Sequence, residues 1–454
     1  MKKLLILLIS IVSLTLFNCK KDFEDYNKVP EEIAYKTPDA YPGIILGMTK
    51  DFTKNTLYRI IHGPGLTATE LGGMNTYLTE PQLENGGPAL PPDNSSLSEL
   101  FYDLHANRNI AEKVLKYIDN LNFANDNEKL GIKSYAKFFK ALTTGYMSQY
   151  WEKVTLENNE NNEAVYVGRI QGLETAVSLL DETINDLDGQ TDAIDYINNL
   201  VSNNFSIIDV LHAFKARYEI ELGNYQEAYN EANAVDLTKM SVWTYDGGTH
   251  KNPLYSHTIY PNATLTIRPI DSLGLTGTQT PEPNDQRIPF YLTYTSTVSE
   301  HGCQFAVDDP KGFWETETSP IPVYLPGEMI LIKAEAKARM GGNANLAEAV
   351  TFINQVRTKT APEDIFGVGA DLSDWTGDAT NQQDVLDEIY KNYAIELFLQ
   401  GQRWPIHRRF YPNYLDNIDF NNTSGCSLER SNNFYPYPDR EHSNNPNCPP
   451  NPAY

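Results

Sequence analysis

The residue spacings that indicate catalysis do not occur in this sequence. It has no GxSxG nucleophile motif, no HExxH zinc motif, and neither a GxxxxGKS/T nor a GxGxxG phosphate-binding loop. Residues 62–65, HGPG, resemble an oxyanion-hole loop, but no nucleophile motif accompanies them. Paired carboxylates such as Asp308 and Asp309 hydrolyse a glycosidic bond only at a defined separation. We therefore expect no catalytic residues, and a binding protein rather than an enzyme.

Cys19 stands at a position that predicts lipidation. It follows two lysines and the apolar run Leu4–Phe17, whose helix would measure about 21 Å against a hydrocarbon core of roughly 30 Å. Residues 1–18 therefore indicate a signal peptide and not a membrane span. The position of Cys19 resembles a bacterial lipobox, although Asn18 stands where a small residue is usual. Residues 19–40 are then a lipidated N-terminus and a polar tether.

The other three cysteines predict at most one disulfide. Cys426 and Cys448 lie in a loop-rich tail and could pair in an oxidising compartment, whereas Cys303 is more typical of a small buried residue. An odd number of remaining cysteines excludes a framework in which every cysteine forms an internal disulfide. There is no CxxC pair and no Cys/His zinc spacing, so we expect no metal and no other cofactor.

Composition restricts the class of protein further. The chain has 454 residues, of which 41% are hydrophobic and 21% charged, as in a globular protein. Its formal net charge of −24 repels phosphate backbones, so nucleic acid is not an expected partner. Tyrosine is common, at 28 residues. Aromatic faces stack on sugars, and a tyrosine hydroxyl can stay hydrated while its ring packs.

The elements that must position such side chains are mainly helical. Apolar residues recur at helical spacing in six segments, two of which contain two helices each. The segments are 100–119, 132–151, 172–187, 207–235, 328–357 and 385–400.

The two double segments have the character of helical repeats. Each has a glycine turn between its helices and a small alanine on either side, where tetratricopeptide-like helices approach closely. The alanines are Ala216 and Ala228 in one hairpin and Ala336 and Ala349 in the other. A generic helical hairpin is the alternative. Stacked pairs would bury a continuous core.

Long segments between the helices indicate loops and a few short strands. Residues 62–99, 236–327 and 358–383 are rich in Gly, Pro, Asn, Thr or Tyr. Loops of this length more often carry function. The expected fold is mainly α: a tetratricopeptide-like scaffold of helical pairs at about 100–235 and 328–410, with long irregular insertions, in a single domain over 41–454.

Four segments together resemble the SusD/RagB family of outer-membrane nutrient-binding lipoproteins. Residues 388–410 resemble its ELxxEGxRxxDLRR motif, with Gln400 where Glu is usual and residues 405–407, PIH, where Asp-Leu is usual. Residues 134–156 resemble its helix that ends in an aromatic-Trp-Gly turn, with Glu152 in place of Gly. The third and fourth segments are 328–360, which closes on NxxR, and 434–441, FYPYPDRE.

This resemblance implies a role in nutrient uptake. Family members bind a glycan, or in some cases a peptide, at the cell surface and deliver it to a SusC-like TonB-dependent transporter. It implies an outer-membrane lipoprotein that faces the cell exterior, with a peptide-binding lipoprotein, a surface glycosidase or a purely structural scaffold as alternatives. By position, the ligand-binding residues would be Asn75, Tyr77, Tyr294 and Trp314, followed by Trp243 and Asp309. Trp151 and Trp404 lie in helical motifs and are expected in the core.

Overall fold

The computed structural model describes most of the chain after the predicted tether. The signal segment and Cys19 lie outside the described residues. Within the described part, no helix is both long and apolar enough to cross a bilayer. The described residues are 31–74, 77–158, 163–258, 265–267, 273–300, 303–422 and 428–452.

The chain enters the fold through a helical rod that the sequence did not predict. Helix α3 (Tyr41–Asp51) continues through a π-helical turn (Phe52–Thr56) into α4 (Leu57–Thr67). Residues 62–99, expected to be irregular, therefore begin inside a helix. The glycines that suggested a loop permit close packing instead: a Cβ at Gly65 would lie 3.1 Å from a methyl group of Leu71.

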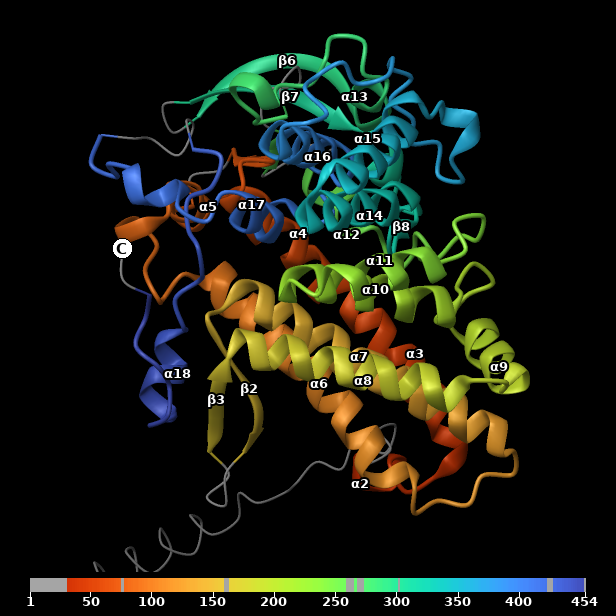
Figure 1. Cartoon of the computed structure of the whole chain (residues 1–454). Coiled ribbons are helices and arrows are strands. Elements are labelled where there is room, and N and C mark those ends of the chain that lie inside the picture. The colour runs from red at the N-terminus through yellow and green to blue at the C-terminus, as the bar shows by residue number, and fades with distance from the viewer. Residues whose placement is uncertain are drawn as a thin grey trace, which may run out of the picture.

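The main scaffold is a continuous stack of helices. Helix α7 packs between α6 and α8, α10 packs against α8 and α11, and α11 packs against α14, which in turn contacts α15 and α16. Figure 1 shows α6, α7 and α8 side by side and the later pairs above them. The bounds are α6 (Ser95–Ile118), α7 (Asp126–Tyr150), α8 (Arg169–Leu187), α10 (Ile207–Leu222), α11 (Tyr225–Ala234), α14 (Pro326–Met340), α15 (Asn343–Thr358), α16 (Gln382–Glu396) and α17 (Arg403–Phe410).

The two predicted hairpins form as the sequence indicates. Gly223 ends α10 in the left-handed region, with φ 83°, and Gly341 ends α14 with φ 71°. All four hairpin alanines are fully buried, which lets the paired helices approach closely. The expectation of a mainly α fold built from helical pairs is confirmed.

Short strands and helices complete the described part. Strands pair antiparallel in four two-stranded sheets: β1 (Leu71–Gly73) with β5 (Leu265–Ile267), β2 (Lys153–Asn158) with β3 (Ala164–Gly168), β4 (Val242–Trp243) with β8 (Ile321–Pro322), and β6 (Leu292–Glu300) with β7 (Cys303–Pro310). The β6–β7 ribbon arches over one end of the molecule (Figure 1). The shorter helices are α2 (Glu31–Ala34), α5 (Thr79–Asn85), α9 (Thr191–Val201), α12 (Pro253–Thr258), α13 (Arg287–Tyr291) and α18 (Asp439–Asn444).

The C-terminal segment completes the core. The ring centre of Tyr435 lies 4.3 Å from that of Trp404, Tyr150 stacks on Trp404 at 5.6 Å, and the two tyrosine rings are 6.4 Å apart, so the three rings form one cluster. The indole N–H of Trp151 donates to the carbonyl of Pro436 at 3.2 Å, and the indole N–H of Trp404 donates to Asn432 at 2.6 Å. Trp151 and Trp404 are therefore core residues, as predicted.

Candidate functional site

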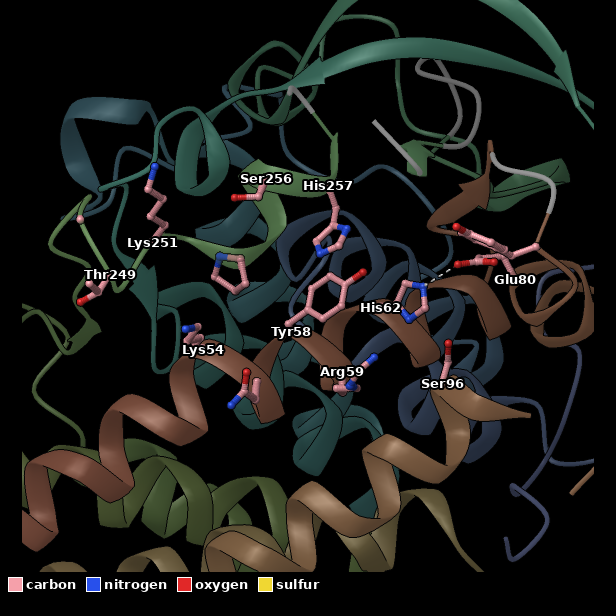
Figure 2. A pocket seen from close by; sticks show the side chains of 14 residues that line it. Lys54, Tyr58, Arg59, His62, Glu80, Ser96, Thr249, Lys251, Ser256 and His257 are labelled. Carbon is pink, nitrogen blue, oxygen red and sulfur yellow. Dashed lines mark ion pairs between the residues drawn. The ribbon is translucent and has the colours of Figure 1, made fainter. Parts of the chain in front are cut away.

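A cavity of about 520 Å³ opens where segments from distant parts of the sequence meet. Its walls are the π-helical turn with α4, the segment that leads into α5, the first turn of α6, and the loop from Gly248 to Lys251 with α12. Figure 2 shows side chains from these elements converging on one space. A volume of this size is typical of small-molecule sites.

Three aromatic rings form a stack along the wall of this cavity. Tyr58 lies between His257 of α12, with ring centres 4.4 Å apart, and His62, with ring centres 5.3 Å apart; the planes are nearly parallel in both pairs. Tyr58 and His62 are four residues apart, so both lie on one face of α4. Burial is the main cause that lowers the pKa of His257, and the neighbouring His62 and Arg59 add to it, which favours a neutral His257 imidazole at neutral pH.

His62 and Glu80 form a polar pair beside the stack. His62 Nε2 lies 3.8 Å from Glu80 Oε1, and Figure 2 marks this contact. Both ring nitrogens of His62 are buried without a hydrogen-bond partner in the described residues. Burial by itself would raise the pKa of Glu80, but His62 and the hydroxyl of Thr79 outweigh it and lower this pKa to about 2. A ligand hydroxyl could satisfy the imidazole and the carboxylate together.

Cationic side chains surround the rest of the cavity. Arg59 pairs with Glu99 at 2.5 Å, and Lys251 pairs with Glu317 at 2.8 Å. Lys54 has no ion-pair partner within the described part of the chain. The hydroxyls of Ser96 and Ser256 line the same space. The cavity therefore combines aromatic rings with donors and acceptors in several directions, as recognition of a polyhydroxylated ligand requires.

Among the residues predicted to bind ligand, Tyr77 lies at this cavity. Its side chain is 67% exposed and lines the wall near Glu80. Asn75 lies outside the described residues. Tyr294 and Asp309 are on paired strands, where Tyr294 faces Asp308 across the ladder and Asp309 faces Thr293; only their backbone is described.

Trp243 and Trp314, the other two predicted ligand-binding residues, are buried. Trp243 is 3% exposed and packs against Phe52 and Phe205, with ring centres 5.6 and 5.9 Å away. Trp314 is fully buried against Tyr291 and Phe313. Both tryptophans follow turn-rich segments, but their side chains point into the core, because burial of a large apolar ring is strongly favourable in free energy.

The predicted disulfide remains a prediction. Cys448 has a free thiol in this structure. Cys426 lies outside the described residues, and only the backbone of Cys303 is described.

Sequence reasoning missed most of the cavity wall. Tyr58, Arg59 and Lys54 belong to a helix that was not predicted, and His257 lies in a segment read as loop. His62 was considered only as part of the HGPG segment that resembles an oxyanion-hole loop. A useful signal was the Tyr58–His62 spacing, which places two rings on one helix face.

Comparisons with known proteins agree with this architecture. A family model described as the SusD family matches residues 224–454. No curated protein matches the sequence. Three similar solved structures illustrate the shared fold at low sequence identity. A SusD superfamily protein from Bacteroides thetaiotaomicron has a TM-score of 0.66 at 14% identity, and the match covers 92% of this chain and 100% of that one. A SusD-like carbohydrate-binding protein from Bacteroides fragilis has a TM-score of 0.65 at 12% identity, with 92% and 100% of the two chains covered. Surface glycan-binding protein A from Bacteroides uniformis has a TM-score of 0.62 at 14% identity, with 91% and 99% covered.

Proposed function

Since this chain belongs to the SusD family, we propose that it captures an oligosaccharide at the cell surface and delivers it to a SusC-like TonB-dependent transporter. The observation that carries the proposal is the cavity beside Tyr58, where three features converge: the exposed ring of Tyr77, the two nitrogens of His62 that lack a hydrogen-bond partner among the described residues, and several hydroxyls. Two proteins of similar fold are named as carbohydrate-binding and glycan-binding.

The chemistry of the wall suits a sugar ring. The exposed face of Tyr77 can stack on the apolar face of a sugar. The hydroxyls of Ser96 and Ser256 and the ammonium of Lys54 can pair with sugar hydroxyls, because no described residue already occupies them. His62 and Glu80 would hold one further hydroxyl between them.

We propose binding without hydrolysis. Among the described lining residues of this cavity, Glu80 is the single carboxylate, whereas glycoside hydrolysis generally uses two that flank the bond. The lowered pKa of Glu80 keeps it ionised at neutral pH, so it is a poor general acid.

We also propose that Cys19 carries the lipid anchor and that the protein faces the exterior of the outer membrane. Support comes from the apolar segment that precedes Cys19 and from membership of the family. Mass measurement of the mature protein tests this: an acylated N-terminal Cys19 is expected, and an unmodified cysteine or a different cleavage site would contradict the anchor.

The binding proposal is tested with the purified mature protein. Isothermal titration against a panel of polysaccharides and peptide mixtures should give heat with at least one polysaccharide, and Tyr77→Ala should weaken that binding roughly tenfold. Val165→Ala, which trims an exposed apolar side chain on β3, should leave it unchanged. Binding to peptides alone would refute the glycan assignment, and release of reducing sugar would refute binding without hydrolysis.

A further inference from the structure

A second cavity, of about 340 Å³, lies in the helical scaffold. It forms where the first residue of α8, Arg169, meets the end of α10, the last turn of α17 and the segment at Phe434. It shares no lining residue with the cavity beside Tyr58. Three of its lining side chains are guanidiniums, from Arg169, Arg408 and Arg409.

Two of these guanidiniums have carboxylate partners. Arg169 Nη2 lies 2.7 Å from Glu221 Oε2. Arg409 forms a fork with Glu335, with both N···O distances at 2.8 Å, and Arg339 binds the same carboxylate at 2.7 Å. Glu335 is therefore shared by two cations.

Arg408 forms no ion pair with a carboxylate of the described residues. It donates to the backbone carbonyls of Asn433 at 2.7 Å and Gln149 at 2.8 Å, and its guanidinium lies 4.4 Å from the ring centre of Phe434. Its side chain is nine-tenths buried. Burial and then the neighbouring charge of Arg169 lower the pKa of Arg408 well below its usual range, yet an arginine side chain stays charged in proteins.

The cluster thus carries a surplus of positive charge. Arg169, Arg339, Arg408 and Arg409 bring four charges, and the two glutamates balance two of them. The buried guanidinium of Arg430 adds to the field at Arg408. A buried charge without a counter-ion is strongly unfavourable, and this surplus occurs in a chain whose formal net charge is −24.

Each guanidinium that lines the cavity also has N–H donors that make no hydrogen bond to the described residues. Nη1 of Arg169, Nε of Arg408 and Nη1 of Arg409 have no acceptor among the described residues. None of these atoms belongs to the fully buried polar atoms without a partner, so they retain contact with solvent. The space holds about ten water molecules at ~30 Å³ each.

We propose that this cavity binds a small oxyanion, the carboxylate or phosphate of a ligand about the size of a monosaccharide. Planar guanidiniums recognise both groups through paired N–H donors, and Arg408 gains the counter-charge that the protein does not supply. The ring of Phe434, which contacts Arg169 and Arg408, supplies an apolar wall for the rest of the ligand. This site is independent of the proposed glycan cavity.

Isothermal titration at constant ionic strength tests the proposal, with galacturonate, glucose 6-phosphate and glucose as probes. Galacturonate or glucose 6-phosphate should bind and glucose should not, and the anion that binds identifies the preferred group. Equal behaviour of all three probes, whether binding or its absence, would overturn the proposal.

Variants then place the anion in this cavity. Arg169→Gln removes a partly exposed guanidinium, and Arg408→Lys keeps the charge but loses the fork; each should weaken anion binding about tenfold or more. Lys133→Gln, which removes a surface cation of α7 that pairs with Asp119, is the matched control and should bind as the wild type does. If Arg408→Lys does not fold, Arg169→Gln decides alone. Anion binding that survives Arg169→Gln would overturn the assignment. Polysaccharide binding by the same variant is measured separately and tests the cavity beside Tyr58.

Discussion

His407 provides a measurable link between pH and stability. It is fully buried on α17, where its Nδ1 accepts from Arg430 Nη1 at 2.8 Å and its Nε2 lies 3.2 Å from Glu429 Oε2. An imidazole that accepts at Nδ1 must be neutral, with its proton on Nε2. Burial is the main cause that lowers the pKa of His407 to about 4; Glu429 opposes it and the charge of Arg430 adds to it.

The sign and size of the effect follow from this pKa. An unfolded chain protonates the histidine near pH 6.5, whereas the folded protein does so only near pH 4. Between these values the unfolded state binds the extra proton, so stability falls as pH falls. The loss attributable to His407 reaches about 2 kcal/mol at pH 5 and about 3 kcal/mol below pH 4.

Urea unfolding followed by circular dichroism at pH 7, 5 and 4 measures this loss. His407→Gln cannot titrate, so its unfolding free energy should decline by about 2 kcal/mol less than that of the wild type between pH 7 and 5. Lys133→Gln should follow the wild type. An identical pH dependence in His407→Gln and the wild type would show that the histidine is not held neutral by its neighbours.

Three further predictions concern packing, charge and binding. Glu328→Gln should lower the free energy of unfolding in urea by about 3–5 kcal/mol, because it leaves the buried guanidinium of Arg217 unpaired. Replacing both partners by apolar residues should cost much less, and a loss under about 1 kcal/mol for Glu328→Gln would contradict this reasoning. Gly145→Ala should lower the melting temperature, because the new Cβ would lie 2.0 Å from a ring carbon of Tyr218. Such overpacking costs roughly 1–3 kcal/mol of stability, and an unchanged melting temperature would refute the close contact. Tyr77→Ala should keep wild-type stability while losing polysaccharide affinity, since its ring is exposed; a large drop in melting temperature would show a structural role instead.

Local patterns accounted for the helical scaffold. The segment 207–235 was expected to hold two helices, and α10 and α11 occupy it with Gly223 at the turn. These helices show strong apolar periodicity and end in a residue that tolerates positive φ. Helix α4 was missed because Gly63, Pro64 and Gly65 are typical of turns. Their helical conformation depends on neighbours such as Leu71 and Leu100, which periodicity within the segment does not reveal.

The candidate site was predicted only in part, because it is assembled from distant segments. Tyr77 was recognised from its loop position, and it lines the cavity. Tyr58 and His257 are 199 positions apart and stack through tertiary packing, which no local spacing encodes. Trp243 and Trp314 were selected by their position in the irregular segments, and both are buried, because burial of a large apolar ring is strongly favourable.

The contacts of Tyr435 with Tyr150 and Trp404 also constrain how this molecule can mature. The backbone N–H of Tyr435 donates to the carbonyl of Tyr150, and its hydroxyl lies 2.8 Å from that of Thr67, so two early helices share one late residue. A ribosome makes this chain from its N-terminus, so the contacts of both helices are complete only after residue 435 has been made. The interior of the nascent chain therefore stays incomplete, and accessible to chaperones and proteases, until Tyr435 emerges from the ribosome.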